Sequence, residues 1–143
     1  MKRRFASALP VGARGPLGLV LGTSVWMAAL GNWPLWQSLS ELGVLQGVKG
    51  WGLAVAMAVM ITAALVALQS LLAWRYTLKP VATLLLLAAA GGAHFMLAYR
   101  IVIDSTMLVN VVQTNPAEAR DLFSLQLFQW LVLGGLLPAW WVW

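Results

Sequence analysis

The sequence contains no cysteine, a single histidine (His94) and only four acidic residues. Without cysteine, the chain can form neither a disulfide framework nor a catalytic thiolate. A zinc site normally needs three or four converging ligands drawn from Cys, His, Asp and Glu, and these residues are too few and too scattered to supply them. We therefore expect no metal ion, no cofactor and no catalytic residue in this chain.

Charge is scarce as well. Charged residues make up 9% of the 143 residues and hydrophobic residues 62%, and the mean hydropathy is +0.84. Soluble domains carry about 25% charged residues, so this composition excludes an ordinary soluble domain. The net charge of +5 does not indicate a nucleic-acid partner, because most basic residues sit in two short clusters beside apolar runs, where they act as topology signals.

Four long apolar runs predict the fold. Each has about the 20 residues or more that a helix needs to cross the hydrocarbon core. The nine tryptophans cluster near the ends of the runs, as in interfacial aromatic belts. We predict an all-α polytopic membrane protein, one domain over residues 1–143, with short amphipathic helices on its outer side. The transmembrane helices are expected at about residues 17–36, 51–74, 80–99 and 122–143.

Two segments near the amino end need separate interpretation. Residues 37–50 are too polar to span, and Ser38 with Glu41 matches a capping box, so a short amphipathic helix is expected on the outer surface. The basic amino end before residues 17–36 also fits a signal peptide, with Ala28-Ala29 as its cleavage site. The apolar run is longer than a typical signal-peptide core, which favours a first transmembrane helix.

The basic residues predict the orientation. Cytoplasmic loops carry an excess of Lys and Arg. With the amino end inside, six basic residues lie on the inner face and three on the outer face, together with every acidic residue. Both termini are therefore expected in the cytoplasm, and residues 100–121 outside. The inner set is Lys2, Arg3, Arg4, Arg14, Arg75 and Lys79, and the outer set is Lys49, Arg100 and Arg120.

A polar stretch between the third and fourth runs stands out from this apolar background. Residues 104–120 read DSTMLVNVVQTNPAEAR, and residues 104–121 hold three of the four acidic residues. Asn115, Pro116 and Glu118 are suited to the N-cap, first and third positions of a helix. On the simplest interpretation these residues only start a helix, and the rest of the stretch is a solvated loop.

The same stretch could bind a lipid head group. Asn110, Thr114 and Glu118 recur at four-residue spacing and fall roughly on one side of the backbone. A carboxylate suits an ammonium group, whereas amide, hydroxyl and guanidinium groups suit a phosphate. Zwitterionic phosphoethanolamine carries both charges. The predicted substrate-binding residues are Asn110, Thr114, Glu118, Arg100 and Arg120.

From Tyr99 onward the chain resembles a known family. The segment YRIVIDSTMLVNVVQTNPAEARDL is similar to the periplasmic segment of the lipid A phosphoethanolamine transferases, which include the mobile colistin-resistance enzymes. The string TNPAEA, residues 114–119, carries most of this resemblance, and the order of the upstream runs also resembles the membrane domain of that family. The matching positions are Tyr99, Asp104, Met107, Asn110, Thr114, Glu118 and Ala119.

The resemblance implies a function. Asn110, Thr114 and Glu118 would correspond to residues that recognise the lipid substrate in phosphoethanolamine transfer. It implies a bacterial inner-membrane protein whose partners are phosphatidylethanolamine, other membrane lipids and lipid A, with a link to colistin and polymyxin resistance. Members of the family have five transmembrane helices and a periplasmic catalytic domain with zinc and a threonine nucleophile. This chain, with four predicted helices, is expected to be the membrane domain without that catalytic domain.

Two other functions compete with this one. Small proton-coupled multidrug exporters also have four helices, but they need a carboxylate within a span, and the four predicted spans contain none. A non-catalytic membrane scaffold or assembly protein remains the alternative.

A few further polar and small residues lie within the spans. His94, in the outer part of the third run, is either functional or partly hydrated near the interface. Gln69 and Thr62 are expected to mediate helix contacts rather than to bind a ligand. Gly91-Gly92 and Gly134-Gly135 are expected to permit close helix packing or bending.

The predicted orientation can be tested by cysteine labelling, because the chain has no natural cysteine. A cysteine introduced at Ser105 should react with a membrane-impermeant thiol reagent added outside the cell. A cysteine at Thr77 should react only after the membrane is permeabilised. The reverse pattern would contradict the predicted topology.

Overall fold

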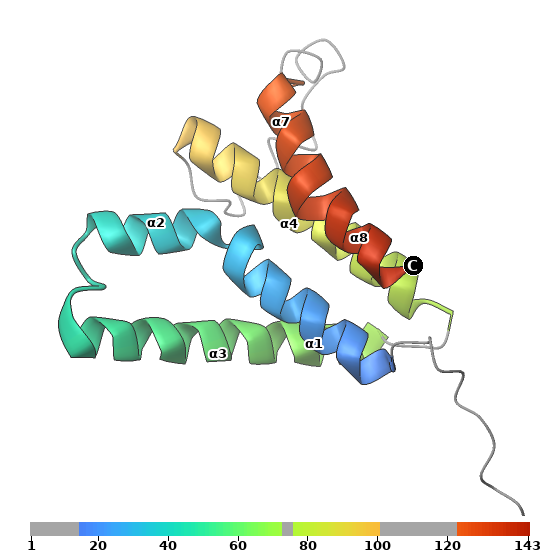
Figure 1. Ribbon diagram of the computed structural model, residues 1–143, viewed down its shortest axis with the longest axis horizontal. Coiled ribbons are helices and arrows are strands. Elements are labelled where there is room, and N and C mark those ends of the chain that lie inside the picture. Colours follow the sequence, from blue (N-terminus) through green and yellow to red (C-terminus); the bar gives the residue numbers. More distant parts are fainter. Residues whose placement is uncertain (1–14, 73–75, 101–122) are drawn as a thin grey trace, which may run out of the picture.

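The computed structural model describes residues 15–72, 76–100 and 123–143, and the regular secondary structure in these residues is helical throughout. An all-α protein is thus confirmed. In chain order the helices are α1 Pro16–Trp26, the π-helix η1 Met27–Gly31, α2 Trp33–Glu41, α3 Gly47–Leu72, α4 Leu78–Tyr99, α7 Leu125–Trp130, the π-helix η2 Leu131–Leu136, and α8 Leu137–Val142 (Figure 1).

Three of these helices are long and apolar enough to cross a membrane: α3, α4 and the continuous helix Leu125–Val142 formed by α7, η2 and α8. The helix Pro16–Gly31, made of α1 and η1, is apolar but shorter. The predicted spans at 51–74 and 80–99 correspond to helices that begin somewhat earlier, at Gly47 and Leu78. Four transmembrane helices therefore remain a prediction.

The first predicted span, residues 17–36, is wrong as a single helix. The chain leaves helical geometry at Asn32, with φ −106° and ψ 22°, and α2 then runs in a new direction, away from the end of α1 (Figure 1). Pro34 explains the break, because its ring would clash with the carbonyl of Leu30 in a continuous helix and it has no N–H to donate. In its actual place, in the first turn of α2, proline is well tolerated.

The amphipathic helix predicted over residues 37–50 is also misplaced. It is α2, which starts at Trp33 and ends at Glu41, so Ser38 and Glu41 lie in its last turn and form no capping box. A turn follows, with Gly43 and Gly47 both at φ +69°, a left-handed conformation that glycine adopts at no steric cost. These two glycines end α2 and let α3 begin at Gly47.

Helix α4 is the centre of the packing, with η1 on one side and the α7–η2–α8 helix on another. Half of its six buried residues are alanines, and glycines of the neighbouring helices approach it closely. A Cβ added to Gly31 would lie 2.9 Å from the Cβ of Ala89, and one added to Gly134 would lie 3.1 Å from the Cβ of Ala90. Close packing at Gly134-Gly135 is therefore confirmed. The buried residues of α4 are Leu78, Ala82, Leu86, Ala90, Ala93 and His94.

Side chains satisfy backbone carbonyls where the helices depart from α geometry. The indole Nε1 of Trp26 donates to the carbonyl of Gly134 in η2 at 3.0 Å. Near η1, Trp36 Nε1 donates to the carbonyl of Ala28, and Asn32 Nδ2 donates to that of Met27, both at 2.9 Å. An unpaired carbonyl costs several kcal/mol in hydrocarbon, so these donors make the interruptions tolerable.

Helix α3 is joined to α1 by a buried polar cluster. Gln69 Nε2 donates to the hydroxyl of Ser24 at 2.7 Å, and the hydroxyl of Thr23 donates to Gln69 Oε1 at 2.9 Å. All three side chains are at most 1% exposed. This confirms Gln69 as a helix-contact residue. Interhelical bonds of this kind contribute about 0.6 kcal/mol each in membrane proteins, and up to about 1.7.

The last residue lies beside the start of α4. Trp143 Nε1 donates to the hydroxyl of Thr83 at 3.2 Å, and the ammonium of Lys79 lies 5.4 Å from the centroid of a Trp143 ring. An indole paired with a lysine at a helix end is typical of a membrane interface. The opposite end of the bundle carries α2 and the last turn of α4.

The glycine contacts around α4 predict a paired stability experiment. Gly31→Ala should lower the free energy of unfolding in detergent micelles by about 1–3 kcal/mol, because its new methyl group meets the rigid Cβ of Ala89. The control is Gly18→Ala in α1, where nothing lies within 4 Å. This control should be neutral or slightly stabilising. Equal effects of the two changes would mean that the close approach of η1 to α4 does not matter for stability.

Candidate functional site

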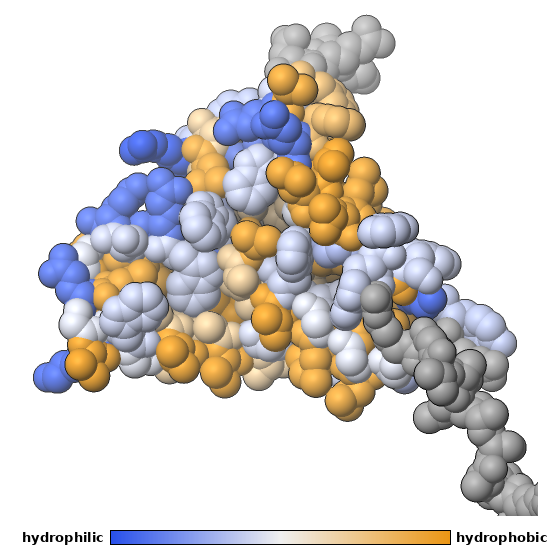
Figure 2. Space-filling view, in the orientation of Figure 1, coloured by the Kyte–Doolittle hydropathy of each residue, from blue (hydrophilic) through white to orange (hydrophobic). Residues whose placement is uncertain are grey.

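Hydrophilic residues gather at one end of the molecule. In Figure 2 they cover α2, the end of α4 and the start of α7, whereas the flanks are largely hydrophobic. Between α2 and the end of α4 lies a partly open cavity of about 200 Å³, which we call the α2–α4 cavity. Its lining residues are Pro34, Gln37, Ser38 and Glu41 of α2, Met96 and Leu97 of α4, and Arg100, which follows α4.

Of the five predicted substrate-binding residues, Arg100 is the one that lies among the described residues. It follows α4 directly and has φ 51° and ψ 39°, the left-handed conformation. Within residues 15–72, 76–100 and 123–143, no other non-glycine residue has a positive φ. This conformation costs an L-residue roughly 1–2 kcal/mol relative to glycine. It places an exposed guanidinium group on the wall of the α2–α4 cavity.

The other four predicted site residues are Asn110, Thr114, Glu118 and Arg120, and they lie outside the described residues. The polar stretch that contains them, residues 104–120, falls between Arg100 and Phe123, where the described residues stop and resume. The substrate-binding assignment of these four residues therefore stays a prediction.

The sequence analysis missed the contribution of α2. Gln37 Nε2 donates to Glu41 Oε1 at 2.9 Å across one helical turn, and both side chains line the α2–α4 cavity. The sequence pattern indicates only a capping role for Glu41. The signal that could have found it is the polar triplet Gln37, Ser38 and Glu41, which follows a Trp-Pro helix start and contrasts with its apolar surroundings.

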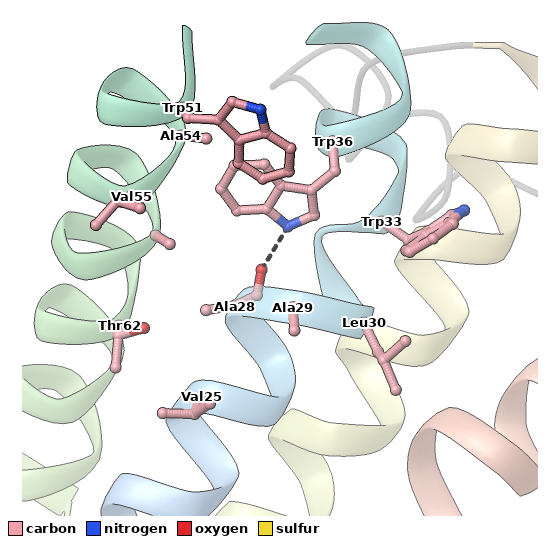
Figure 3. Close-up of a pocket in the computed structure, with 11 residues that line it drawn as sticks. Val25, Ala28, Ala29, Leu30, Trp33, Trp36, Trp51, Ala54, Val55 and Thr62 are labelled. Carbon is pink, nitrogen blue, oxygen red and sulfur yellow. Dashed lines mark hydrogen bonds between the residues drawn. The ribbon is translucent and has the colours of Figure 1, made fainter. Parts of the chain in front are cut away.

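The other side of α2 borders an apolar groove of about 360 Å³. Figure 3 shows the indole rings of Trp36 and Trp51 at one end of this groove and Thr62 of α3 toward the other, with the Trp36–Ala28 bond on its wall. No charged residue lines it, so its chemistry suits hydrocarbon chains rather than a head group. Its lining residues are Val25, Ala28, Ala29, Leu30, Trp33, Trp36, Trp51, Ala54, Val55, Ala58 and Thr62.

His94 is buried in α4, with 3% of its surface exposed, and its ring makes an edge contact with Phe95 at 5.3 Å. Its Nδ1 atom has no hydrogen-bond partner within the described residues. It does not line the α2–α4 cavity. Among the same described residues, no group of three His, Cys, Asp or Glu side chains lies close enough together to hold a metal ion.

Comparison with known proteins identifies the family. A sequence model of the family described as phosphoethanolamine transferase EptA/EptB matches residues 61–143, more than half of the chain. The chain belongs to this family, as an N-terminal domain. The resemblance found in the sequence is thereby confirmed.

Individual relatives agree with the family match. The chain is 35% identical over 123 residues to the phosphatidylethanolamine transferase Mcr-2 of Escherichia coli and 33% identical over 124 residues to Mcr-1, covering 86% and 87% of this chain. Phosphoethanolamine transferase EptA of E. coli K12 is 38% identical over 61 residues, which is 43% of this chain and 11% of that protein. The chain spans 22% of the length of Mcr-2 and 23% of that of Mcr-1. No solved structure matches.

The conformation of Arg100 predicts a stability effect that is independent of any ligand. Arg100→Gly removes the cost of the left-handed conformation and should be about 1 kcal/mol more stable than Arg100→Ala, which retains that cost. Detergent-micelle unfolding of the two variants measures the difference. Both changes remove the charge, so a lost ion pair cannot account for it. An alanine variant as stable as the glycine variant would contradict the left-handed geometry.

Proposed function

We propose that this chain is the membrane domain of a phosphoethanolamine transferase, that it engages phosphatidylethanolamine at its outer end, and that it positions a periplasmic catalytic domain that modifies lipid A. The observation that carries the proposal is the match of most of the chain to proteins named phosphatidylethanolamine transferases. The zinc and the nucleophile of such a reaction would belong to the catalytic domain.

The arrangement of charge supports this proposal. Arg100, at the end of α4, lies four residues before the polar stretch in the sequence and lines the α2–α4 cavity. A guanidinium group binds phosphate oxygens through charge-assisted hydrogen bonds. Arg100 and Arg120 would therefore hold the phosphate of the lipid, with Asn110 and Thr114 as neutral hydrogen-bonding partners, and Glu118 would pair with the ammonium group.

The apolar surface supports a location in the bacterial inner membrane. Three helices have the length and composition of membrane spans, and the sides of the molecule are largely hydrophobic (Figure 2). The excess of basic residues in the amino-terminal segment and between the second and third apolar runs supports an orientation with both termini in the cytoplasm and residues 100–121 in the periplasm. A head group in the outer leaflet would then meet the polar end.

Glu118→Gln tests the proposed ammonium contact, since it keeps the shape of the side chain and removes its charge. It should weaken binding of phosphatidylethanolamine by roughly 1 kcal/mol, the scale of a partly screened charged contact. Binding of phosphatidylglycerol, which has no ammonium group, should change little. Lipid titrations of the purified chain in detergent measure both affinities.

Asp121→Asn is the matched control for this experiment, because it removes a neighbouring carboxylate that the motif does not include. It should leave both affinities unchanged. If Glu118→Gln affects the two lipids equally, Glu118 does not bind the ammonium group, and its role is that of a helix-capping residue.

A further inference from the structure

We propose that α2 forms a second wall of the head-group site. In this wall, Glu41, held by Gln37, binds the ammonium group of a phosphoethanolamine lipid whose phosphate contacts Arg100. The inference rests on the proposed function and deepens it, because it adds Gln37 and Glu41 of α2 to Arg100, all of which line the α2–α4 cavity. Neither Glu41 nor Gln37 belongs to the motif that relates the chain to its family.

The rotation of α2 about its axis is fixed, and this determines where Glu41 lies. Trp36 turns toward the apolar groove and donates to the carbonyl of Ala28 at 2.9 Å (Figure 3). Pro34 is buried and lines the α2–α4 cavity on the other side. With these two contacts made, Gln37 and Glu41 border that cavity rather than the groove.

The hydrogen bond between Gln37 and Glu41 prepares the carboxylate for a cation. An ionised carboxylate accepts hydrogen bonds only, and it has two oxygens with about four lone-pair sites. The Gln37 amide engages Oε1 at 2.9 Å and restrains the side chain. The remaining acceptor sites suit the three N–H groups of an ethanolammonium ion.

The α2–α4 cavity offers opposite charges on opposite walls. Glu41 comes from α2, and Arg100 comes from the end of α4. One water needs roughly 10–15 Å³, so a volume of about 200 Å³ accommodates a group of several atoms. Met96 and Leu97 add apolar surface for the carbon atoms between the two charges.

A zwitterion fits this arrangement better than an anionic lipid does. Phosphatidylethanolamine can satisfy both walls, whereas phosphatidylglycerol would contact Arg100 and leave Glu41 near a phosphate of like charge. The alternative is that Gln37 and Glu41 form an ordinary pair one helical turn apart on a solvated helix face. On that alternative, neither residue affects lipid binding.

The test is a titration of the purified chain in detergent with phosphatidylethanolamine and, separately, with phosphatidylglycerol. Glu41→Gln should weaken phosphatidylethanolamine binding about fivefold, which corresponds to the roughly 1 kcal/mol expected of a solvent-screened charged contact. It should not weaken phosphatidylglycerol binding. Arg100→Gln should weaken the binding of both lipids.

Lys49→Gln serves as the control, since it removes an exposed charge near the start of α3 that does not line the cavity. It should change neither affinity. Gln37→Ala should give a smaller loss of phosphatidylethanolamine binding, and this loss should disappear in the Glu41→Gln background, because Gln37 acts by positioning Glu41. A loss that persists in that background would overturn the positioning role.

The outcomes separate this inference from the proposed function. If Glu41→Gln leaves phosphatidylethanolamine binding unchanged while Glu118→Gln weakens it, the α2 wall is overturned and the proposed function stands. If the unaltered chain binds the two lipids equally well, the proposed selectivity for phosphatidylethanolamine is overturned as well. Thermal unfolding of each variant shows whether it is folded. Glu41 is exposed, so its substitution should leave the fold intact.

Discussion

The architecture depends on one constraint: every backbone carbonyl in a hydrocarbon environment needs a donor. The chain interrupts its first helix near Asn32 and distorts its last helix in η2, and at each place a side chain supplies that donor. Trp36 and Asn32 satisfy carbonyls of η1, and Trp26 reaches across to the carbonyl of Gly134. Pro34 prevents a continuous first helix, and these bonds supply donors to carbonyls beside the break and in η2.

The turn at Asn32 generates the features that bear on function. It sends α2 between two hollows, the apolar groove along α3 and the α2–α4 cavity at the end of α4. The two hollows have different chemistry because α2 presents tryptophans to one and Gln37, Ser38 and Glu41 to the other. A lipid has the same division between chains and head group. The break in the first helix thus links backbone hydrogen bonding to the proposed recognition of a lipid.

Much of the fold could be predicted from the sequence, and the errors have definable causes. The runs that became α3, α4 and the final helix were predictable because length and apolarity alone identify a membrane helix. The helix-contact role of Gln69 was predictable because a lone amide in an apolar run needs a partner. The prediction of one helix over residues 17–36 was wrong because it rested on hydropathy alone. Pro34 lies inside that run, and a proline within a helix breaks it.

Residues of the candidate site could be predicted only where they lie in or beside the sequence motif. Arg100 stands next to the family motif and was found, and it lines the cavity. Glu41 and Gln37 were not found, because they reach the same cavity through the packing of α2 on α4. The local pattern marks them as a polar face but does not show which part of the molecule that face meets. The roles of Asn110, Thr114, Glu118 and Arg120 still rest on the motif.

The central claim is that this domain by itself selects a zwitterionic phosphoethanolamine lipid at its polar end. Native mass spectrometry tests it most directly: the chain is incorporated into nanodiscs with equal amounts of phosphatidylethanolamine and phosphatidylglycerol, and the lipids that remain bound after release are identified. We expect retained phosphatidylethanolamine to exceed phosphatidylglycerol several-fold, as a difference of roughly 1 kcal/mol requires. Retention of the two lipids in the proportions of the nanodisc would contradict the claim.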